Sequence, residues 1–323
     1  MSIPASLTLL NEALLMSLLI NDILTENTVF ILGAGASHVY GFPLGPELKK
    51  LILEYQLGDI EKYFKGQDIN NLLPLMNEFK EIIRYGDFST IDEFLERKRR
   101  FRELGAYFIV AVLGKREHHD LIFPQRDFYR ELFYMLNLES EEKPIPPLKI
   151  VTLNYERSLE YFLSKNCLYN CSQDYEEIAQ EKVSRLQIIH AHGSLGSLIS
   201  VPYGQVLSDN KHVKQAVENI RIISDRFDDS DEFISAQNVI SEAKNIIFLG
   251  FGYHRRTLKS LFSKSKLEEK DIYGTSFKLS QEGREVMYDF TKGANFKLFG
   301  SENEDISAFL KKLQNESKSK LFE

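Results

Sequence analysis

The sequence of 323 residues contains only two cysteines, Cys167 and Cys171, and no tryptophan. Two thiols cannot form a disulfide framework or supply the thiolates of a four-cysteine zinc ribbon. Thiols that are this few and have no histidine nearby are typical of reduced residues in a cytoplasmic protein. We therefore expect a cytoplasmic chain that needs no zinc.

Long apolar runs are also missing. The leucine-rich residues 1–26 lack a basic stretch at their start and are interrupted by polar residues such as Glu12 and Asp22, which argues against a signal peptide, a membrane span or a membrane partner. Their leucines instead recur on one face of a helix: Leu7, Leu10, Leu14, Leu15 and Leu18. We expect an amphipathic helix that packs on its own domain or on a second copy of the chain.

An excess of positive charge is absent as well. The formal net charge is −7 and the isoelectric point is near 5.7, so we expect no direct sequence-specific nucleic-acid binding. The clearest basic run, Lys98 to Arg100, lies in a helical pattern that also carries Glu93, Glu96 and Glu103. This mixture of charges predicts a solvated helix face.

The sequence does have a short apolar run that ends in glycines. Val29 to Leu32 is too short for a helix and is typical of a buried strand. The residues that follow are Gly33, Ala34, Gly35, Ala36 and Ser37. Glycines let the backbone turn sharply and approach a pyrophosphate, and a following helix presents free N–H groups to such an anion. His38 stands where the dinucleotide fingerprint has a third glycine, so a tight turn without a ligand stays an alternative.

Strand and helix patterns alternate along the rest of the chain. Buried-strand patterns recur at residues 148–154, 187–193, 245–252, 272–279 and 296–299, and helical patterns at 47–55, 70–85, 90–115, 155–165, 255–264, 281–290 and 305–313. This alternation predicts an α/β fold with a Rossmann-like parallel sheet, helices on both faces and a helical insertion after the first strand-helix unit. We place the insertion at about residues 58–140, the domain at 27–315, a tail at 316–323 and a mobile loop at 207–230.

In such a sheet, ligands bind beyond the carboxyl ends of the strands. The residues that follow the predicted strands are residues 33–37, Asn154, His192, Gly193, Gly250, Phe251 and Gly252. Since parallel strands end at the same edge of a sheet, we expect these residues to converge on one site.

Asn154 and His192 offer chemistry beyond binding. A side-chain amide can hold a water or a ribose hydroxyl in place, and an imidazole with a near-neutral pKa can take a proton from it. With a dinucleotide on the glycine turn, the bond within reach joins ribose to nicotinamide, whose pyridinium is a good leaving group. The pair therefore predicts a site that stabilises an oxocarbenium-like centre and admits one water.

These segments together resemble a known family. Residues 33–37, 152–156, 192–194 and 250–252 occur in the order and approximate spacing of sirtuin-like domains, over roughly residues 25–315. The resemblance looks closest to the prokaryotic branch found in antiphage defence systems, in which segments similar to residues 90–95 and 201–204 also recur. Proteins of this branch degrade cellular NAD after sensing infection, and they are commonly oligomeric and silent until triggered.

The resemblance implies a role for each matching residue. The turn at 33–37 would bind the dinucleotide phosphates, Asn154 would orient the nicotinamide ribose or water, and His192 would act as the general base. Glu156 would contact ribose, and Gly250 and Gly252 would pass close to the adenosine half. The same comparison puts two neighbours of these residues into the expected cofactor-binding set, Gly193 and Phe251.

The sequence also departs from the family pattern. Deacylases of the family carry a four-cysteine zinc module, which two cysteines cannot supply. Glu156 stands where an aspartate is usual, and Pro43-Leu44 is followed by Gly45-Pro46 where deacylases have a phenylalanine-arginine pair. A deacylase is therefore disfavoured, and no zinc is expected.

Plain structural roles remain alternatives for several of these residues. Asn154 could be only the N-cap of the next helix, and His192 could only cap its turn. His190 fits a hydrogen-bonded core histidine better than a partner of the site. His38 and His254 could each meet phosphates or merely start a helix.

The adjacent pair His118 and His119 is a further case with a plain alternative. Beside Asp120 the two histidines resemble a metal cluster. Adjacent residues rarely point at one ion, so this segment predicts a solvated helix end.

The resulting hypothesis is an NAD+ glycohydrolase that releases nicotinamide and ADP-ribose in antiphage abortive infection, with NAD as its substrate and a homo-oligomeric state. The alternative is a catalytically silent nucleotide-binding subunit that regulates or scaffolds a defence complex. In either case we expect a partner in trans, such as an ATPase, helicase or nuclease. A zinc-independent deacylase or ADP-ribosyltransferase is a weaker third hypothesis.

Overall fold

The computed structural model describes residues 27–64, 69–123, 128–140, 145–170, 176–221, 230–275, 277–292, 294–299 and 304–310. The helix expected at residues 1–26, Cys171 and the tail expected at 316–323 lie outside these ranges. The last residues of the helix expected at 305–313 and part of the loop expected at 207–230 also lie outside them.

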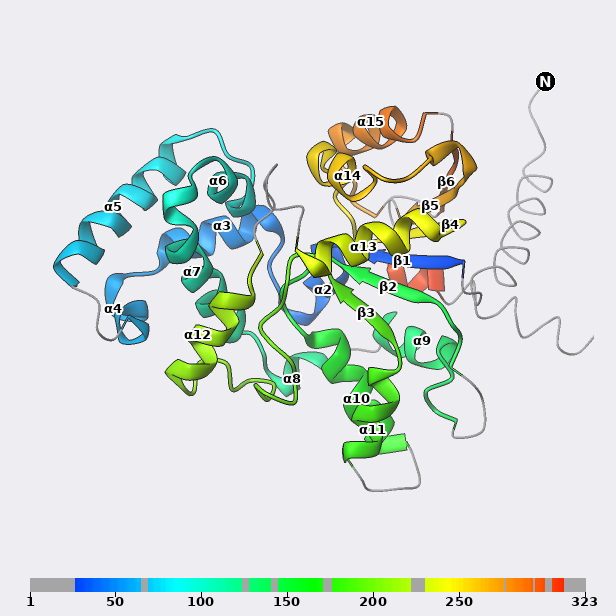
Figure 1. Ribbon diagram of the computed structural model, residues 1–323, viewed down its shortest axis with the longest axis horizontal. Helices are drawn as coiled ribbons and strands as arrows, with labels where there is room; N and C mark the ends of the chain where they lie inside the picture. Colours follow the sequence, from blue (N-terminus) through cyan, green and yellow to red (C-terminus); the bar gives the residue numbers. More distant parts are fainter. Residues whose placement is uncertain are drawn as a thin grey trace, which may run out of the picture.

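Six strands form one parallel sheet (Figure 1). In chain order they are β1 (Thr28–Leu32), β2 (Lys149–Thr152), β3 (Gln187–His190), β4 (Asn245–Leu249), β5 (Asp271–Thr275) and β6 (Asn295–Phe299). Their order across the sheet is β3-β2-β1-β4-β5-β6, which is the order of doubly wound dinucleotide-binding folds. The direction of strand addition reverses between β1 and β4, and ligands bind such folds at that point. The predicted Rossmann-like α/β sheet is confirmed.

Helices cover both faces of the sheet. One layer contains α13 (Asp231–Glu242), α14 (Arg255–Leu261) and α15 (Gln281–Phe290), and the other contains α9 (Phe128–Met135), α10 (Ser158–Asn170) and α11 (Glu176–Ser184). Val29 and Ile31 belong to the hydrophobic cluster of the first layer, and Phe30 and Leu32 to that of the second, because successive strand residues point to opposite faces. Burial of each of these side chains contributes roughly 1.5–3 kcal/mol to folding.

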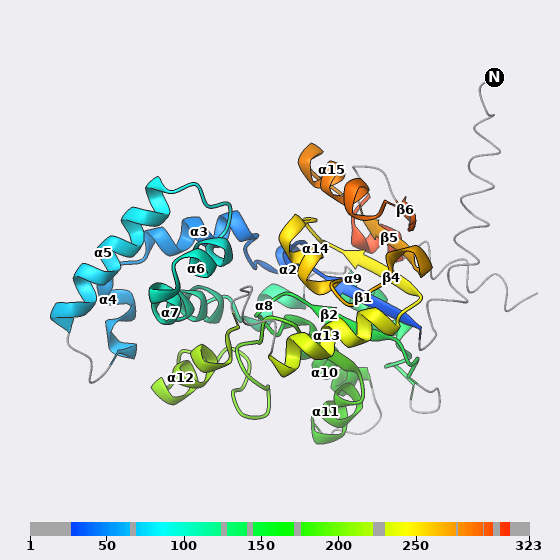
Figure 2. The same cartoon turned by 45° about the horizontal axis from the view of Figure 1, so that its top comes forward.

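A second group of helices, the helical lobe, lies beyond the carboxyl ends of β1, β2 and β3, toward which the strand arrows point (Figures 1 and 2). It consists of α3 (Gly45–Glu54), α4 (Leu57–Ile60), α5 (Ile69–Tyr85), α6 (Ile91–Arg97), α7 (Arg102–Gly114) and α12 (Asn210–Asn219). Residues Leu104 to Gly114 of α7 are all buried, and a helix that is apolar on every side forms the centre of its own core. Gly105 lets α6 pack closely on α7, since a Cβ there would lie 2.4 Å from the Leu95 side chain.

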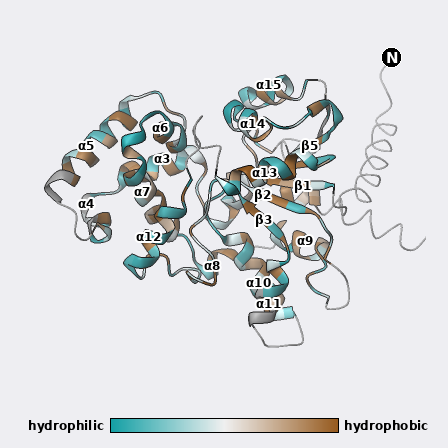
Figure 3. Cartoon of the chain, viewed as in Figure 1, coloured by the Kyte–Doolittle hydropathy of each residue, from teal (hydrophilic) through white to brown (hydrophobic). Residues whose placement is uncertain are grey.

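Short helices connect these parts. They are α2 (Ala34–Ser37) and α8 (His119–Ile122), with 3-10 turns η1 (His38–Tyr40), η2 (Glu61–Tyr63), η3 (Arg99–Phe101) and η4 (Leu267–Glu269). Hydrophobic residues concentrate on β1 and β2, and hydrophilic residues on α12 and α15 (Figure 3). Within the described ranges, no helix combines the length and apolar character needed to cross a bilayer.

The prediction of a single helix over residues 90–115 is wrong, because α6, η3 and α7 occupy this range. The Thr90 hydroxyl does cap the N–H of Glu93, as the sequence predicted, but α6 ends at Lys98, whose φ of −119° and ψ of 65° are not helical. The chain then turns through η3 and enters α7. The break lets α6 fold back on α7. The basic residues Lys98 to Arg100 are exposed at this turn, and Arg100 forms an ion pair with Glu78.

Two other expected boundaries differ from the structure. The loop expected at 207–230 contains α12, where Asp209 caps the N–H of Lys211 and the buried Val213 and Ala216 share the core with α7. The helix expected at 155–165 begins only at Ser158. Both differences follow from side chains that satisfy the first N–H groups of a helix.

Candidate functional site

The carboxyl ends of β1, β2, β3 and β4 are neighbours. We call residues 33–37, 153–157, 190–193 and 250–252 the strand-end site. Backbone hydrogen bonds continue the sheet into these turns. Leu153 donates to the Leu32 carbonyl at 3.0 Å, Ala191 donates to the Thr152 carbonyl at 2.9 Å, and Gly33 donates to the Leu249 carbonyl at 3.0 Å. The strand ends predicted to converge therefore do meet.

The glycine turn packs directly against the turn after β4. The N–H of Gly35 donates to the Gly250 carbonyl at 2.9 Å, and a Cβ at Gly33 would lie 2.7 Å from that same oxygen. Gly250 has φ of +60°, and a Cβ there would lie 2.2 Å from the Ala36 nitrogen. These glycines permit a close approach of two backbones. The N–H groups of Gly33 and Gly35 are already hydrogen-bonded within the protein, so phosphate binding by this turn would use other atoms.

The rest of the turn is partly hidden. Ala36 and Ser37 are buried, and Ala34 and Gly35 are half-buried. The N–H of Ala34 has no partner within its own helix because it lies in the first helical position. His38 is exposed, and its Nδ1 lies 3.2 Å from the Phe42 carbonyl oxygen. The expected phosphate contact of residues 34–37 stays a prediction.

Asn154 joins β2 to the glycine turn. Its Nδ2 donates to the Gly33 carbonyl at 3.2 Å and lies 3.3 Å from the Ser37 hydroxyl. The same nitrogen lies 3.4 Å from Oε1 of Glu156. Because Nδ2 is held by these acceptors, Oδ1 is the side-chain atom left to accept from a hydroxyl or water. The amide thus lies beside the glycine turn, as the sequence predicted.

Glu156, expected to contact ribose, has a structural position. Its carboxylate accepts from the N–H of Ser158 at 2.6 Å and so caps α10; the alternative role of Asn154 as the N-cap of this helix is thus filled by Glu156. Glu156 is buried, and this burial raises the pKa of the carboxyl against the opposing effect of hydrogen bonds from Ser158 and Ser37. A contact with ribose would require it to exchange these partners.

His192 follows β3 and is buried, with 8% of its surface exposed. The Asp92 carboxylate and the backbone of Leu153 are polar groups near its ring. Nε2 has no hydrogen-bond partner in the part of the chain that the structure describes. In the neutral tautomer that carries its proton on Nδ1, the ring has a lone pair on Nε2.

The charge state of His192 follows from its burial. Burial lowers the pKa of the imidazole, and the nearby Asp92 and the Leu153 carbonyl offset only part of that effect. The ring is therefore uncharged at neutral pH. A neutral imidazole with an unpaired Nε2 can accept a proton.

His190 has a different environment two residues earlier. Its Nδ1 lies 2.8 Å from the Asn154 carbonyl oxygen, and its Nε2 forms an ion pair with Glu160. Burial alone would lower the pKa of His190, but Glu160 and both hydrogen bonds outweigh it and raise the pKa. The ring is thus a charged donor that fixes the backbone of Asn154. It is the hydrogen-bonded, largely buried histidine that the plainer alternative predicted.

The remaining predicted residues lie nearby with mixed roles. Gly193 has φ of +72°, and a Cβ there would lie 1.8 Å from the Asn219 carbonyl oxygen, so only glycine fits at the end of α12. Phe251 is buried between the rings of Phe248 and Tyr253, at 4.8 and 5.3 Å between centroids. Its side chain therefore belongs to the hydrophobic core. Gly252 is exposed.

The helical lobe contacts this site, which the sequence did not predict. The Tyr155 hydroxyl donates to Oδ1 of Asp92 in α6 at 2.5 Å, and the Tyr155 ring lies 6.0 Å from that of His192. A second contact is the ion pair between Arg256, the second residue of α14, and Glu96 of α6. The only signal in the sequence was the resemblance at residues 90–95.

A buried ion pair explains the segment at residues 201–204. Arg157 binds Glu117 through two nitrogens, at 2.9 and 2.6 Å, and its third nitrogen donates to the Val201 carbonyl at 2.5 Å. The N–H of Gly204 donates to Glu117 at 3.0 Å. The pair therefore fixes the loop after the strand-end site to the end of α7. Nothing in the sequence indicated that Glu117 and Arg157 meet.

Metal ligands do not gather in the described ranges, where no group of three histidine, cysteine, aspartate or glutamate side chains could hold an ion. Cys167 is buried beside the Leu138 carbonyl oxygen. His118 and His119 are exposed, and His119 stacks on Phe123 and contacts the Tyr161 hydroxyl. The exposed helix end expected for this segment is confirmed.

No protein-family model matches the chain, and no curated protein matches its sequence. The fold alone does not define a function, because doubly wound sheets host many activities. A function for this chain therefore has to be inferred from the residues of the strand-end site.

Proposed function

We propose that this chain is an NAD+ glycohydrolase whose reaction occurs at the strand-end site and depletes NAD in antiphage abortive infection. One observation carries the proposal. His192 lies two residues beyond β3, which pairs with the strand that leads to Asn154, and it is buried with a lowered pKa and with no hydrogen-bond partner for Nε2 among the described residues. The Asn154 amide contacts the glycine turn. A buried polar atom without a partner is costly and is often a functional atom.

The reaction assigns a task to each side chain. The bond between ribose C1′ and the nicotinamide nitrogen breaks, and its electron pair leaves with neutral nicotinamide. Oδ1 of Asn154 accepts from a ribose hydroxyl or the attacking water, and Nε2 of His192 takes the proton that this water loses as its oxygen bonds to C1′. The products are nicotinamide and ADP-ribose, with the proton first on His192 and then in solvent.

The enclosure of His192 bears on regulation. Nε2 is shielded from solvent in this structure, so water and dinucleotide reach it only after a neighbouring element shifts. This agrees with a chain that is silent until a homo-oligomer forms or a partner such as an ATPase acts. The same enclosure favours the second candidate, a nucleotide-binding regulatory or scaffold subunit without turnover.

The decisive experiment follows nicotinamide release from NAD+ by the purified full chain, alone and with a candidate ATPase partner. We expect His192→Ala to lower turnover by about 100-fold or more, which is the usual contribution of a general base, and Asn154→Ala to lower it at least about tenfold. His118→Ala is the matched control because His118 is exposed, and it should leave turnover unchanged.

Two outcomes would decide against hydrolysis by this pair. Turnover that survives both Asn154→Ala and His192→Ala would remove the mechanism. Binding of NAD+ without consumption, under conditions that assemble the complex, would favour the silent subunit. An acylated-peptide assay and a labelled-NAD+ transfer assay separate the deacylase and ADP-ribosyltransferase hypotheses from both.

A further inference from the structure

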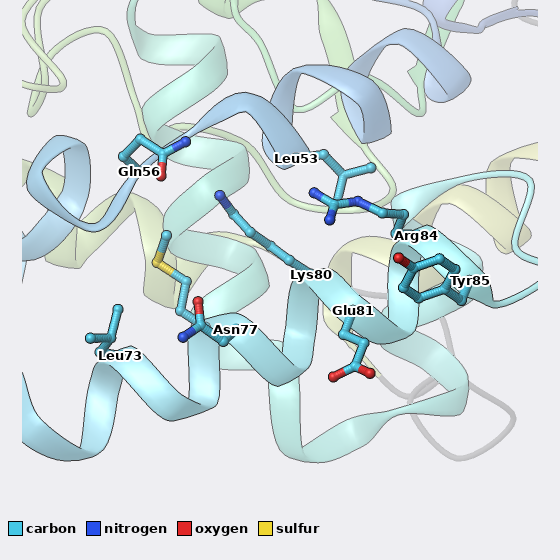
Figure 4. Close-up of a pocket in the computed structure, with 9 residues that line it drawn as sticks. Leu53, Gln56, Leu73, Asn77, Lys80, Glu81, Arg84 and Tyr85 are labelled. Carbon is cyan, nitrogen blue, oxygen red and sulfur yellow. The ribbon is translucent and has the colours of Figure 1, made fainter.

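A cavity of about 520 Å³ lies in the helical lobe, away from the strand-end site (Figure 4). It lies between the last turn of α3, the segment that follows it and one face of α5. Its volume falls in the range of small-molecule sites, roughly 300–1,000 Å³. None of its lining residues belongs to the proposed reaction.

Two cations from successive turns of α5 line this cavity. Lys80 is 9% exposed and extends toward Gln56, and the guanidinium of Arg84 extends toward Leu53 (Figure 4). The Lys80 ammonium donates to the Tyr55 carbonyl. An ammonium has three donors, and that carbonyl is the one acceptor it meets in the described part of the chain. Arg84 makes no hydrogen bond or ion pair there.

No carboxylate of the described residues forms an ion pair with Lys80 or Arg84. The carboxylate of Glu81 points away from the Lys80 ammonium (Figure 4). Asp59 accepts from the N–H of Gln56 at 2.7 Å and lies 4.0 Å from Lys115. Like charges four residues apart on a helix repel each other, so an anion between Lys80 and Arg84 would stabilise the pair.

The electrostatics of Lys80 agree with this need. Burial lowers the pKa of Lys80 and the neighbouring Arg84 lowers it further, while Asp59 opposes both effects. A bound anion would reverse this shift, since an opposite charge favours the charged form. Lysine and arginine side chains both bind phosphate, arginine often through two parallel hydrogen bonds and lysine as a point charge.

The other walls suit a planar heterocycle. Leu53, Leu73 and Met76 supply apolar surface, and Gln56 and Asn77 supply amide donors and acceptors. Tyr85 also lines the cavity, and 79% of its surface is exposed. Every nucleobase has a face that can stack on such a ring.

We propose that this cavity binds a nucleoside phosphate, with the phosphate between Lys80 and Arg84 and the base against Tyr85. The site is separate from the proposed NAD+ site and lies on the lobe whose helix α6 contacts Tyr155. A nucleotide bound here is therefore placed to act on the strand-end site through the helical lobe.

Titration calorimetry of the full chain tests the proposal with ADP as the probe. We expect ADP to bind and Arg84→Gln to weaken it at least about tenfold, because charge-assisted hydrogen bonds are lost. Arg84 is exposed and makes no hydrogen bond or ion pair with the described residues, so the exchange removes no polar contact of the fold. Arg99→Gln, at an exposed arginine of the same lobe, should change the affinity by less than about twofold.

Further arms separate the possible sources of binding. Asn154→Ala should leave ADP affinity unchanged, and adenosine or inorganic phosphate alone should each bind more weakly than ADP. Absence of ADP binding, equal affinity in Arg84→Gln, or loss in Asn154→Ala would overturn the proposal. Phosphate binding as tightly as ADP would overturn the nucleoside part. Lys80→Met is a second variant, and it should also weaken ADP binding. Its ADP affinity is compared with that of the parent chain only if the two unfold at the same temperature.

Discussion

The two halves of the strand-end site use their polar groups in opposite ways. At the contact between β1 and β4, the N–H groups of Gly33 and Gly35 donate to the carbonyls of Leu249 and Gly250, so both glycine N–H groups on the β1 side have protein acceptors. At the contact between β2 and β3, Nε2 of His192 lies buried without a partner in the described ranges. Packing alone explains the glycines, but it does not explain the unpaired imidazole.

The comparison shows which motif carries functional information. A glycine pattern after a strand reports a close backbone approach, whether the second backbone or a phosphate fills the space. A buried lone pair without a partner is different. It lowers the stability of the folded chain by about 1–3 kcal/mol, so packing does not account for it. The case for chemistry is therefore stronger on the β2–β3 side than on the glycine side.

The largest expected effect tests the packing role of the glycines. In Gly250→Ala the new Cβ would lie 2.2 Å from the Ala36 nitrogen at a positive φ of 60°. Overpacking and backbone strain together should lower the free energy of unfolding by roughly 2–5 kcal/mol, measured by urea denaturation.

Gly58→Ala is the control for that substitution. Gly58 lies in α4, and a Cβ there would meet no atom within 4 Å. It should be neutral or should stabilise the chain by up to about 1 kcal/mol. If Gly250→Ala matched Gly58→Ala in stability, the close approach would not be what requires glycine.

The next prediction sharpens the argument for His192 through pH. Only the uncharged imidazole accepts a proton, and burial lowers the pKa of His192 below its ordinary value of about 6.5. The midpoint of the acid decline in NAD+ turnover, where His192 becomes charged, should therefore lie below about pH 6.5. A histidine in solvent would already be half charged at that pH.

The measurement is the rate of nicotinamide release between about pH 5 and pH 8, with circular dichroism at each pH to confirm that the chain is folded. A midpoint at or above the ordinary histidine pKa, in a folded protein, would contradict the buried neutral base. The acid decline should also be absent from the residual activity of His192→Ala.

The sheet and the convergence of its ends could be predicted from sequence because they depend on local patterns. Val29 to Leu32 and Ile246 to Leu249 are short apolar runs followed by glycine, and such runs form buried parallel strands. Asn154 and His192 each lie two residues beyond the ends of β2 and β3, the next two strands across the sheet from β1. Their place at the same edge of the sheet as the glycine turn then follows from the parallel arrangement.

Other features depend on contacts between distant residues, which no local pattern reveals. The break at Lys98 exists because α6 returns to pack Leu95 on Gly105. The resemblance placed Glu156 at a ribose-contacting position, yet α10 starts late and uses its carboxylate as a cap. The pairing of Glu117 with Arg157 joins residues 40 positions apart.

The smallest expected effect concerns the bridge from α6 to the unpaired half of the site. Tyr155→Phe removes the hydroxyl that donates to Asp92 at 2.5 Å. Because Asp92 is only half-buried, water can replace part of this bond, and the free energy of unfolding should fall by about 1–2 kcal/mol. Tyr169→Phe, at a tyrosine that is 59% exposed, should change it by less than about 0.5 kcal/mol.

A double-mutant cycle with Asp92→Asn isolates the pair, because residues that share a hydrogen bond show non-additive effects. The two single losses should sum to more than the loss in the double variant. If they add instead, the hydroxyl and the carboxylate act separately. The helical lobe would then be joined to His192 through packing of the Tyr155 ring, and a signal from that lobe would have to reach the base by that contact.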